Sequence, residues 1–106
     1  MEDITISPYD VKEKIHNEED VLLLDVREPG EFKTAQIHGA KLIPLKELSL
    51  RTGELPKDAE IIAYCHHGVR SLQAAHLLTS KGFNAKSMAG GIDSWSQQID
   101  GHVPRY

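Results

Sequence analysis

The chain of 106 residues has one cysteine, no long apolar run and no basic patch, and each shortage excludes a class of protein. One cysteine cannot close an internal disulfide, so Cys65 is a free thiol that suits a reducing compartment. No apolar run approaches the ~20 residues of a membrane span, and the acidic start lacks the features of a signal peptide. With a net charge of −4 and no basic patch interleaved with aromatic residues, nucleic-acid binding is disfavoured. We expect a soluble, cytoplasmic protein that binds neither nucleic acid nor membrane.

Aspartate and glutamate are absent from residues 61–92, the stretch that contains the cysteine. Arg70, Lys81 and Lys86 give this stretch a formal charge of +3, so the rest of the chain carries −7. Two interpretations fit this asymmetry. Either the stretch is a buried strand and helix that exclude carboxylates, or it contains a site for an anion.

Short apolar runs mark five expected strands. The chain length suits one compact domain, which we expect to span residues 1–106, and the 40% apolar and 26% charged content is near the globular average. We expect strands over residues 4–6 and 21–26 and within AKLIPL, EIIAYC and FNAKSM. The continuous apolar runs are typical of strands buried on both faces.

Helical patterns alternate with these strands. Ser7 and Pro8 predict the start of a first helix, residues 71–81 predict a long helix capped by Gly82, and IDSWSQQI predicts a closing helix with Trp95 in the core. We interpret REPGEF as a break and KELSLRTGELP as a helical turn and connection. The alternation predicts an α/β fold with a small, mostly parallel central sheet flanked by helices on both faces.

The loop CHHGVR lies between an expected strand and an expected helix, where parallel sheets bind ligands. Gly68 can supply the positive φ that a tight turn requires. The backbone N–H groups of such a turn would then surround an anion and stabilise a thiolate, which is a nucleophile. The alternative is that Cys65 is a small buried apolar residue, but its position favours a functional role.

The side chains of this loop leave alternatives open. We do not expect His66 and His67 to bind zinc, because adjacent side chains diverge and no second Cys or His pair lies at zinc spacing. They could tune charge or substrate choice at the site, or be exposed without a role. Arg70 could reach back over the loop and hold an oxyanion through two parallel hydrogen bonds, or it could be a surface charge that caps the helix or forms a salt bridge.

Four segments, LLLDVREPGEF, IHGAKLIP, IIAYCHHGVRS and MAGGIDSW, resemble the rhodanese family in order and spacing, over nearly the whole chain. The resemblance implies a rhodanese-like fold and a sulfurtransferase of the thiosulfate sulfurtransferase type that needs no metal or organic cofactor. It implies that Cys65 is the catalytic residue and carries sulfur as a persulfide. The residues implied to bind the substrate are His66, His67, Gly68, Val69 and Arg70.

Supporting roles are expected for Asp25, Arg27 and Ser71. The family signature DVRxxxEF is matched by Asp25, Arg27 and Glu31, for which we expect structural roles. Arg27 and Glu31 are spaced for an ion pair, and Asp25 can bind loop amides or cap the next turn. The segment QIHGA departs from the family's frequent HIPGA, a structural turn, so the change puts little in doubt.

The resemblance implies a double displacement, with thiosulfate or a persulfide as donor and a small thiol, cyanide or a sulfur-carrier protein as acceptor. The sequence is also similar to rhodanese domains fused to enzymes that activate sulfur-carrier proteins. A phosphatase or arsenate reductase of the same fold is disfavoured, because four residues separate Cys65 from Arg70 and the phosphatase loop is one residue longer. A non-catalytic module for docking or sulfide sensing is the other alternative, although such modules usually lose the cysteine.

Overall fold

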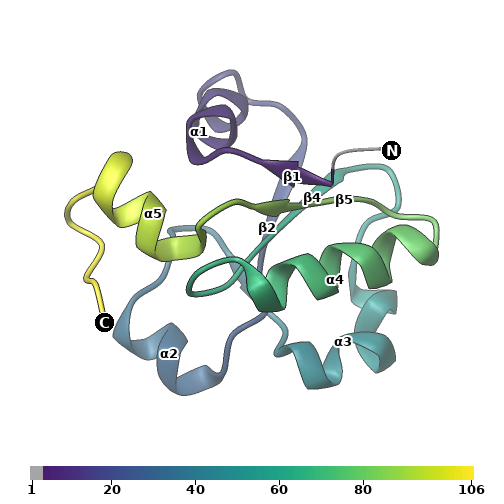
Figure 1. Ribbon diagram of the computed structural model, residues 1–106. Helices are drawn as coiled ribbons and strands as arrows, with labels where there is room; N and C mark the ends of the chain where they lie inside the picture. Colours follow the sequence, from purple (N-terminus) through teal and green to yellow (C-terminus); the bar gives the residue numbers. More distant parts are fainter. Residues whose placement is uncertain (1–3) are drawn as a thin grey trace.

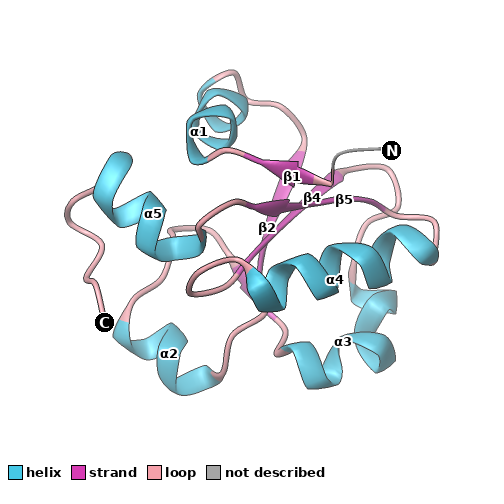
Figure 2. Ribbon diagram, viewed as in Figure 1, coloured by secondary structure: helices cyan, strands magenta, loops and turns pink. Residues whose placement is uncertain are grey.

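A twisted sheet of five parallel strands forms the centre of the molecule, in the order β1-β5-β4-β2-β3 (Figures 1 and 2). The computed structural model describes residues 4–106. The strands are β1 (Thr5–Ile6), β2 (Val21–Asp25), β3 (Lys41–Leu42), β4 (Glu60–Tyr64) and β5 (Asn84–Met88). All five expected strands are therefore present, and the predicted α/β fold with a parallel sheet is confirmed.

Helices cover both faces of this sheet (Figure 1). They are α1 (Pro8–His16), α2 (Pro29–Thr34), α3 (Leu45–Arg51), α4 (Val69–Ser80) and α5 (Gly91–Gln98), with a short 3₁₀ turn at Thr52–Glu54. The Ser7 side chain caps α1 by accepting a hydrogen bond from the Asp10 N–H at 3.1 Å, as the sequence predicts. Among the helices of residues 4–106, none is long and apolar enough to cross a membrane.

The sequence of strand β4 is a continuous apolar run because both faces of this strand are buried. Ile61 and Ala63 belong to one core cluster, which includes residues of α3 and α4. Ile62 and Tyr64 belong to a second cluster, which includes residues of α1 and α5, Trp95 among them. Because successive side chains of a strand point to opposite faces, both sets are buried. The strand therefore ends in a rigid, dry environment, and the next residue is Cys65.

Two local expectations were wrong. The segment REPGEF does not break the chain but begins α2, because Pro29 occupies the first helical turn and the Glu28 N–H donates to the Glu31 carboxylate at 3.1 Å. Helix α4 begins two residues earlier than predicted, and its buried face starts at Ser71, whereas Leu72 is exposed. The buried face of α4 therefore begins directly beside the cysteine loop.

Candidate active site

The loop from Cys65 to Gly68 turns the chain from the end of β4 into the start of α4. Gly68 precedes the helix with a φ of +108°, in the left-handed region that the sequence required there. A Cβ at this position would lie 3.3 Å from the backbone nitrogen of Gly90, so space as well as dihedral angle favours glycine. The tight turn directs backbone N–H groups towards the cysteine.

The Cys65 sulfur lies in a cradle of these N–H groups. Gly68 N–H donates to Sγ at 3.1 Å, and Ser71 N–H points at Sγ from 3.4 Å. The residue is 1% exposed, so bulk water does not compete for these contacts. Donors aimed at sulfur from the first turn of a helix stabilise a thiolate relative to a thiol. The arrangement therefore prepares Cys65 to act as a nucleophile.

A pair of serine hydroxyls lies behind the sulfur. Ser71 Oγ is 3.5 Å from Cys65 Sγ and 2.7 Å from Ser87 Oγ, and both serines are buried. Ser71 comes from α4 and Ser87 from β5, so the pair connects the cradle to the sheet. The supporting role expected for Ser71 stays a prediction, and Ser87, its partner here, had no signal in the sequence.

The outer side of the loop is fixed by the start of α5. Ile92 N–H donates to the Cys65 carbonyl at 2.8 Å, and Asp93 N–H donates to the His66 carbonyl at 3.2 Å. Gly91 makes this approach possible, since it has a φ of +62° and a Cβ there would overlap both carbonyl oxygens. The sequence alone indicates only a turn at these glycines. Gly91 lets the N-terminus of α5 hold the cysteine loop.

A buried ion pair lies at the end of β2. Arg27 binds the Asp25 carboxylate through Nη2 at 2.6 Å and through Nε at 2.9 Å, and both side chains have no solvent exposure. The Asp25 carboxylate also accepts from the Arg27 backbone N–H at 3.0 Å, so it caps the turn as expected. The predicted ion pair of Arg27 with Glu31 was wrong, because the guanidinium reaches only the Glu31 backbone carbonyl, at 3.4 Å.

The Arg27 side chain is charged, and its remaining donors hold the chain near the site. Burial works to lower the pKa of Arg27, but hydrogen bonds to Asp25 and Tyr106 outweigh it and raise the pKa above its ordinary value. Nη1, the atom that reaches the Glu31 carbonyl, also donates to the Tyr106 hydroxyl at 2.7 Å. Arg27 therefore joins the sheet to the C-terminal segment, which runs from α5 back towards α2 (Figure 1).

Arg70 is not a free surface charge. Its Nη1 and Nη2 donate to the two carboxylate oxygens of Glu31 at 2.6 and 2.9 Å, in the parallel two-bond geometry that suits arginine. Tyr106 completes the group by donating its hydroxyl to Glu31 at 2.7 Å. We call Glu31, Arg70 and Tyr106 the Glu31 cluster. It joins α2, α4 and the C-terminal segment beside the cysteine loop.

The protonation states in the Glu31 cluster follow from these contacts. The Arg70 hydrogen bonds, helped by Tyr106 and opposed by partial burial, lower the pKa of Glu31 to about 2. Burial, with the Glu31 hydrogen bond, raises the pKa of Tyr106 to about 12, so its hydroxyl stays protonated. The Glu31 contact raises the pKa of Arg70, and the charge of nearby Cys65 adds to the rise. Glu31 therefore stays an anion in the neutral pH range, in contact with Arg70 at the end of the cysteine loop.

The two loop histidines pack against each other, so the expectation that they diverge was wrong. Their rings stack with centroids 3.9 Å apart, and Tyr106 stacks on the other face of His66 at 4.0 Å. Burial, followed by the His67 charge, lowers the pKa of His66, which favours its neutral ring. Tyr106 thus covers the His66 ring of the cysteine loop.

Asp93 gathers with these histidines, and one potential ligand atom from each of the three lies within 4.8 Å of the others. The Asp93 oxygens are already used, since Arg105 Nε binds at 2.8 Å and Gln97 Nε2 at 2.9 Å. A metal ion there would compete with the Arg105 cation for the Asp93 carboxylate. The absence of a zinc site stays a prediction.

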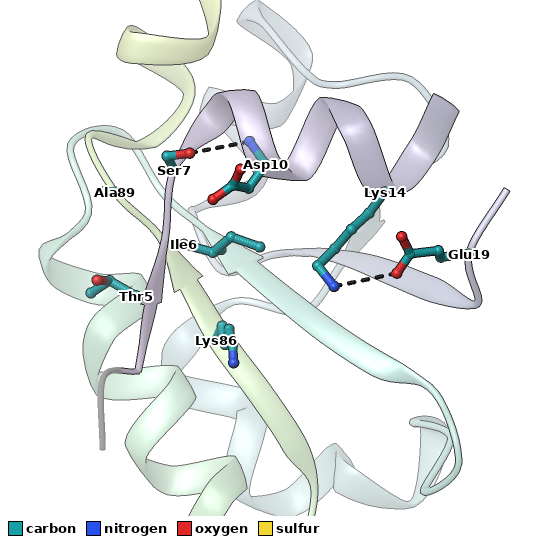
Figure 3. Close-up of a pocket in the computed structure, with 8 residues that line it drawn as sticks. All are labelled: Thr5, Ile6, Ser7, Asp10, Lys14, Glu19, Lys86 and Ala89. Atoms are coloured by element: carbon teal, nitrogen blue, oxygen red, sulfur yellow. Dashed lines mark hydrogen bonds and ion pairs between the residues drawn. The ribbon is translucent and has the colours of Figure 1, made fainter. Parts of the chain in front are cut away.

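A separate groove of about 590 Å³ lies between β1 and α1 (Figure 3). It contains no residue of the cysteine loop. Two of its polar side chains have structural partners: Ser7 caps α1, and Lys14 binds Glu60 at 2.9 Å and Glu19 at 3.3 Å. The nucleophile and its surrounding donors are all at the cysteine loop, which is therefore the candidate active site.

A parallel sheet with a cysteine cradled by amides at the end of its central strand defines a class of α/β group-transfer domains. Residues 7–98 match the rhodanese-like domain. This chain belongs to that family. It is 33% identical over 93 residues to a sulfurtransferase of Allochromatium vinosum, covering 87% of each chain. Relatives with this name support sulfur transfer as the activity of the family.

Two further comparisons show how the domain is used. A rhodanese-related protein of Thermoplasma volcanium has the same fold, with a TM-score of 0.83 and 34% identity, covering 90% of this chain and 92% of that one. The probable adenylyltransferase/sulfurtransferase MoeZ of Mycobacterium tuberculosis is 33% identical over 105 residues. The match covers 96% of this chain but 27% of that protein. The domain therefore occurs both by itself and within larger proteins.

Proposed function

We propose that this chain is a rhodanese-type sulfurtransferase that carries sulfur on Cys65 as a persulfide, with residues 1–106 acting as one domain. The observation that supports it most is the pair of backbone N–H groups, from Gly68 and Ser71, aimed at the Cys65 sulfur at 3.1 and 3.4 Å. Each stabilises negative charge on sulfur, both on the attacking thiolate and on the thiolate that leaves when the persulfide is used.

The reaction has two steps. In the first, the Cys65 thiolate attacks the outer sulfur of thiosulfate, the S–S bond of the donor breaks and its electron pair leaves with sulfite. In the second, a nucleophile such as a thiolate or cyanide attacks the outer sulfur of the persulfide and releases the Cys65 thiolate. The S–S bond of about 2.05 Å places the outer sulfur beyond Sγ, where an acceptor reaches it. The free thiol suits a reducing compartment such as the cytoplasm.

The rest of the loop contributes position and charge. The carbonyls of Cys65 and His66 are held by α5, so the N–H groups keep their direction while sulfur is gained and lost. Arg70 lies close enough for its charge to interact with that of Cys65, and we assign it to the binding of anionic donors. Four residues between Cys65 and Arg70 form a smaller ring than a phosphoryl group requires, which disfavours a phosphatase.

Mass spectrometry of the intact protein tests this proposal. After incubation with thiosulfate and removal of excess donor, we expect a mass increase of one sulfur atom, which cyanide reverses. Cys65→Ser should show no increase. A serine variant that still gained sulfur, or a wild-type protein that gained none from thiosulfate or from a persulfide, would show that Cys65 is not a sulfur carrier.

A further inference from the structure

Glu31 places a permanent negative charge beside the sulfur-binding loop. Both of its oxygens are engaged: Arg70 donates to them at 2.6 and 2.9 Å, and Tyr106 donates at 2.7 Å. Its side chain is 23% exposed, so solvent only partly screens this charge. With a pKa of about 2, the carboxylate does not become protonated to make room for a second anion.

The cations around the loop are balanced by carboxylates. Arg70 faces Glu31, and Arg105 faces Asp93 at 2.8 Å. Arg27 is also paired, with Asp25, in a fully buried contact. A donor that carries two negative charges must therefore share Arg70 with Glu31, and it meets the repulsion of that carboxylate as it approaches Cys65. A donor without net negative charge avoids this competition.

We propose that Glu31 is a specificity-determining residue that selects sulfur donors by charge, so that the site takes sulfur from persulfides of neutral or positive net charge in preference to the thiosulfate dianion. The inference rests on the proposed function and narrows its substrate class. The Cys65 thiolate attacks the outer sulfur of a persulfide, R–S–S–H. The S–S bond of the donor breaks, its electron pair leaves with R–S⁻, and the proton stays on the new Cys65 persulfide.

The test compares two donors of different charge on the same protein preparations. Thiosulfate is the dianion, and cysteamine persulfide is the probe whose ammonium group offsets its persulfide charge. For each donor, the second-order rate constant for sulfur loading is measured by quenching the reaction with an alkylating reagent and recording the mass of the intact protein. The ratio of the two constants is the readout. A variant that is partly unfolded lowers both constants alike, so its ratio is unaffected.

Glu31→Gln keeps the size of the side chain and one hydrogen bond to Arg70 but removes the charge. We expect the ratio to shift towards thiosulfate by about five- to twentyfold, the effect of removing one like charge from near a dianion in a partly screened site. Glu31→Asp restores the charge and should return the ratio to within about twofold of wild type. Glu13→Gln changes net charge equally on the exposed surface of α1 and should leave the ratio unchanged.

The outcomes separate this inference from the proposed function. If both donors load sulfur onto Cys65 but Glu31→Gln leaves their ratio within about twofold of wild type, charge selection by Glu31 is wrong and sulfur transfer stands. Charge selection by Glu31 is equally wrong if Glu13→Gln shifts the ratio as much, because the effect is then one of total charge. If neither donor loads sulfur onto the wild-type protein, both proposals fail.

Discussion

Replacing Gly91 by alanine should disturb the cysteine loop from its outer side. Gly91 has a φ of +62°, and a Cβ at this position would overlap the carbonyl oxygens of Cys65 and His66. The added methyl group must push the start of α5 away from the loop. The two N–H donors that follow Gly91 would then lose their carbonyl partners, and the cradle around the sulfur would lose its support.

The expected loss of unfolding free energy is the sum of the backbone strain and the two weakened hydrogen bonds. A left-handed backbone costs an L-residue roughly 1–2 kcal/mol. Each weakened backbone hydrogen bond, one at 2.8 Å and one at 3.2 Å, adds about 0.5–1.5 kcal/mol. Together they lower the free energy of unfolding by roughly 2–5 kcal/mol. In a domain of about this size, ~1 kcal/mol corresponds to roughly 4–8 °C in Tm, so Tm falls by at least about 8 °C.

Urea unfolding gives the stability of this variant, and intact mass after incubation with a donor gives its sulfur loading. Gly53→Ala is the matched control, because Gly53 has an ordinary φ and nothing lies within 4 Å of an added Cβ. It should unfold within about 0.5 kcal/mol of wild type and load sulfur normally. A Gly91→Ala protein as stable and as reactive as this control would refute the argument that close contact with α5 holds the loop.

Other residues give independent predictions. Arg70→Ala removes the cation and leaves Glu31 uncompensated, so kcat/KM for thiosulfate should fall about ten- to a hundredfold, and a change under about twofold would show that Arg70 does not bind the donor. Arg27→Met leaves the fully buried Asp25 carboxylate without its cation. Urea unfolding should show a loss of roughly 3–5 kcal/mol, and a loss under ~1 kcal/mol would contradict this role. The Arg70 hydrogen bonds lower the pKa of Glu31 from 4.5 to about 2, so Glu31 stabilises the fold above about pH 4.5 and this contribution disappears as pH falls towards 2. The stability gap between wild type and Glu31→Gln, about 1–2 kcal/mol after screening, should therefore narrow as pH falls from about 4.5 towards 2; a constant gap would contradict the ion pair. Aryl phosphates should not be hydrolysed and vanadate should not inhibit; phosphatase activity would contradict the loop-size argument.

The strands and the thiol loop could be predicted because their signals are local. A continuous apolar run such as Val21–Asp25 has one interpretation in a short α/β chain, and each such run was found as a buried strand. The positive φ of Gly68 was required by the length of the turn between strand and helix. The α2 helix was missed because Pro-Gly was interpreted as a break, although proline also begins helices.

Contacts between distant segments could not be predicted from spacing. Glu31 lies four residues after Arg27, which is the spacing of a helical ion pair, yet it binds Arg70, which is far away in the sequence. Buried Asp25 held Arg27 more strongly and left Glu31 free to pair across the site. Tyr106 has no local pattern that indicates a role, and only the path of the C-terminal segment brings it to His66 and Glu31.

The central claim is that the Cys65 sulfur carries the transferred atom. Intact mass spectrometry of the wild-type protein and of Cys65→Ser, each incubated with thiosulfate and separately with cysteamine persulfide, tests it most directly. We predict the mass of one added sulfur atom on the wild-type protein, its removal by cyanide, and no addition to the variant. Equal addition to the two proteins, or no addition to either with both donors, would contradict the account.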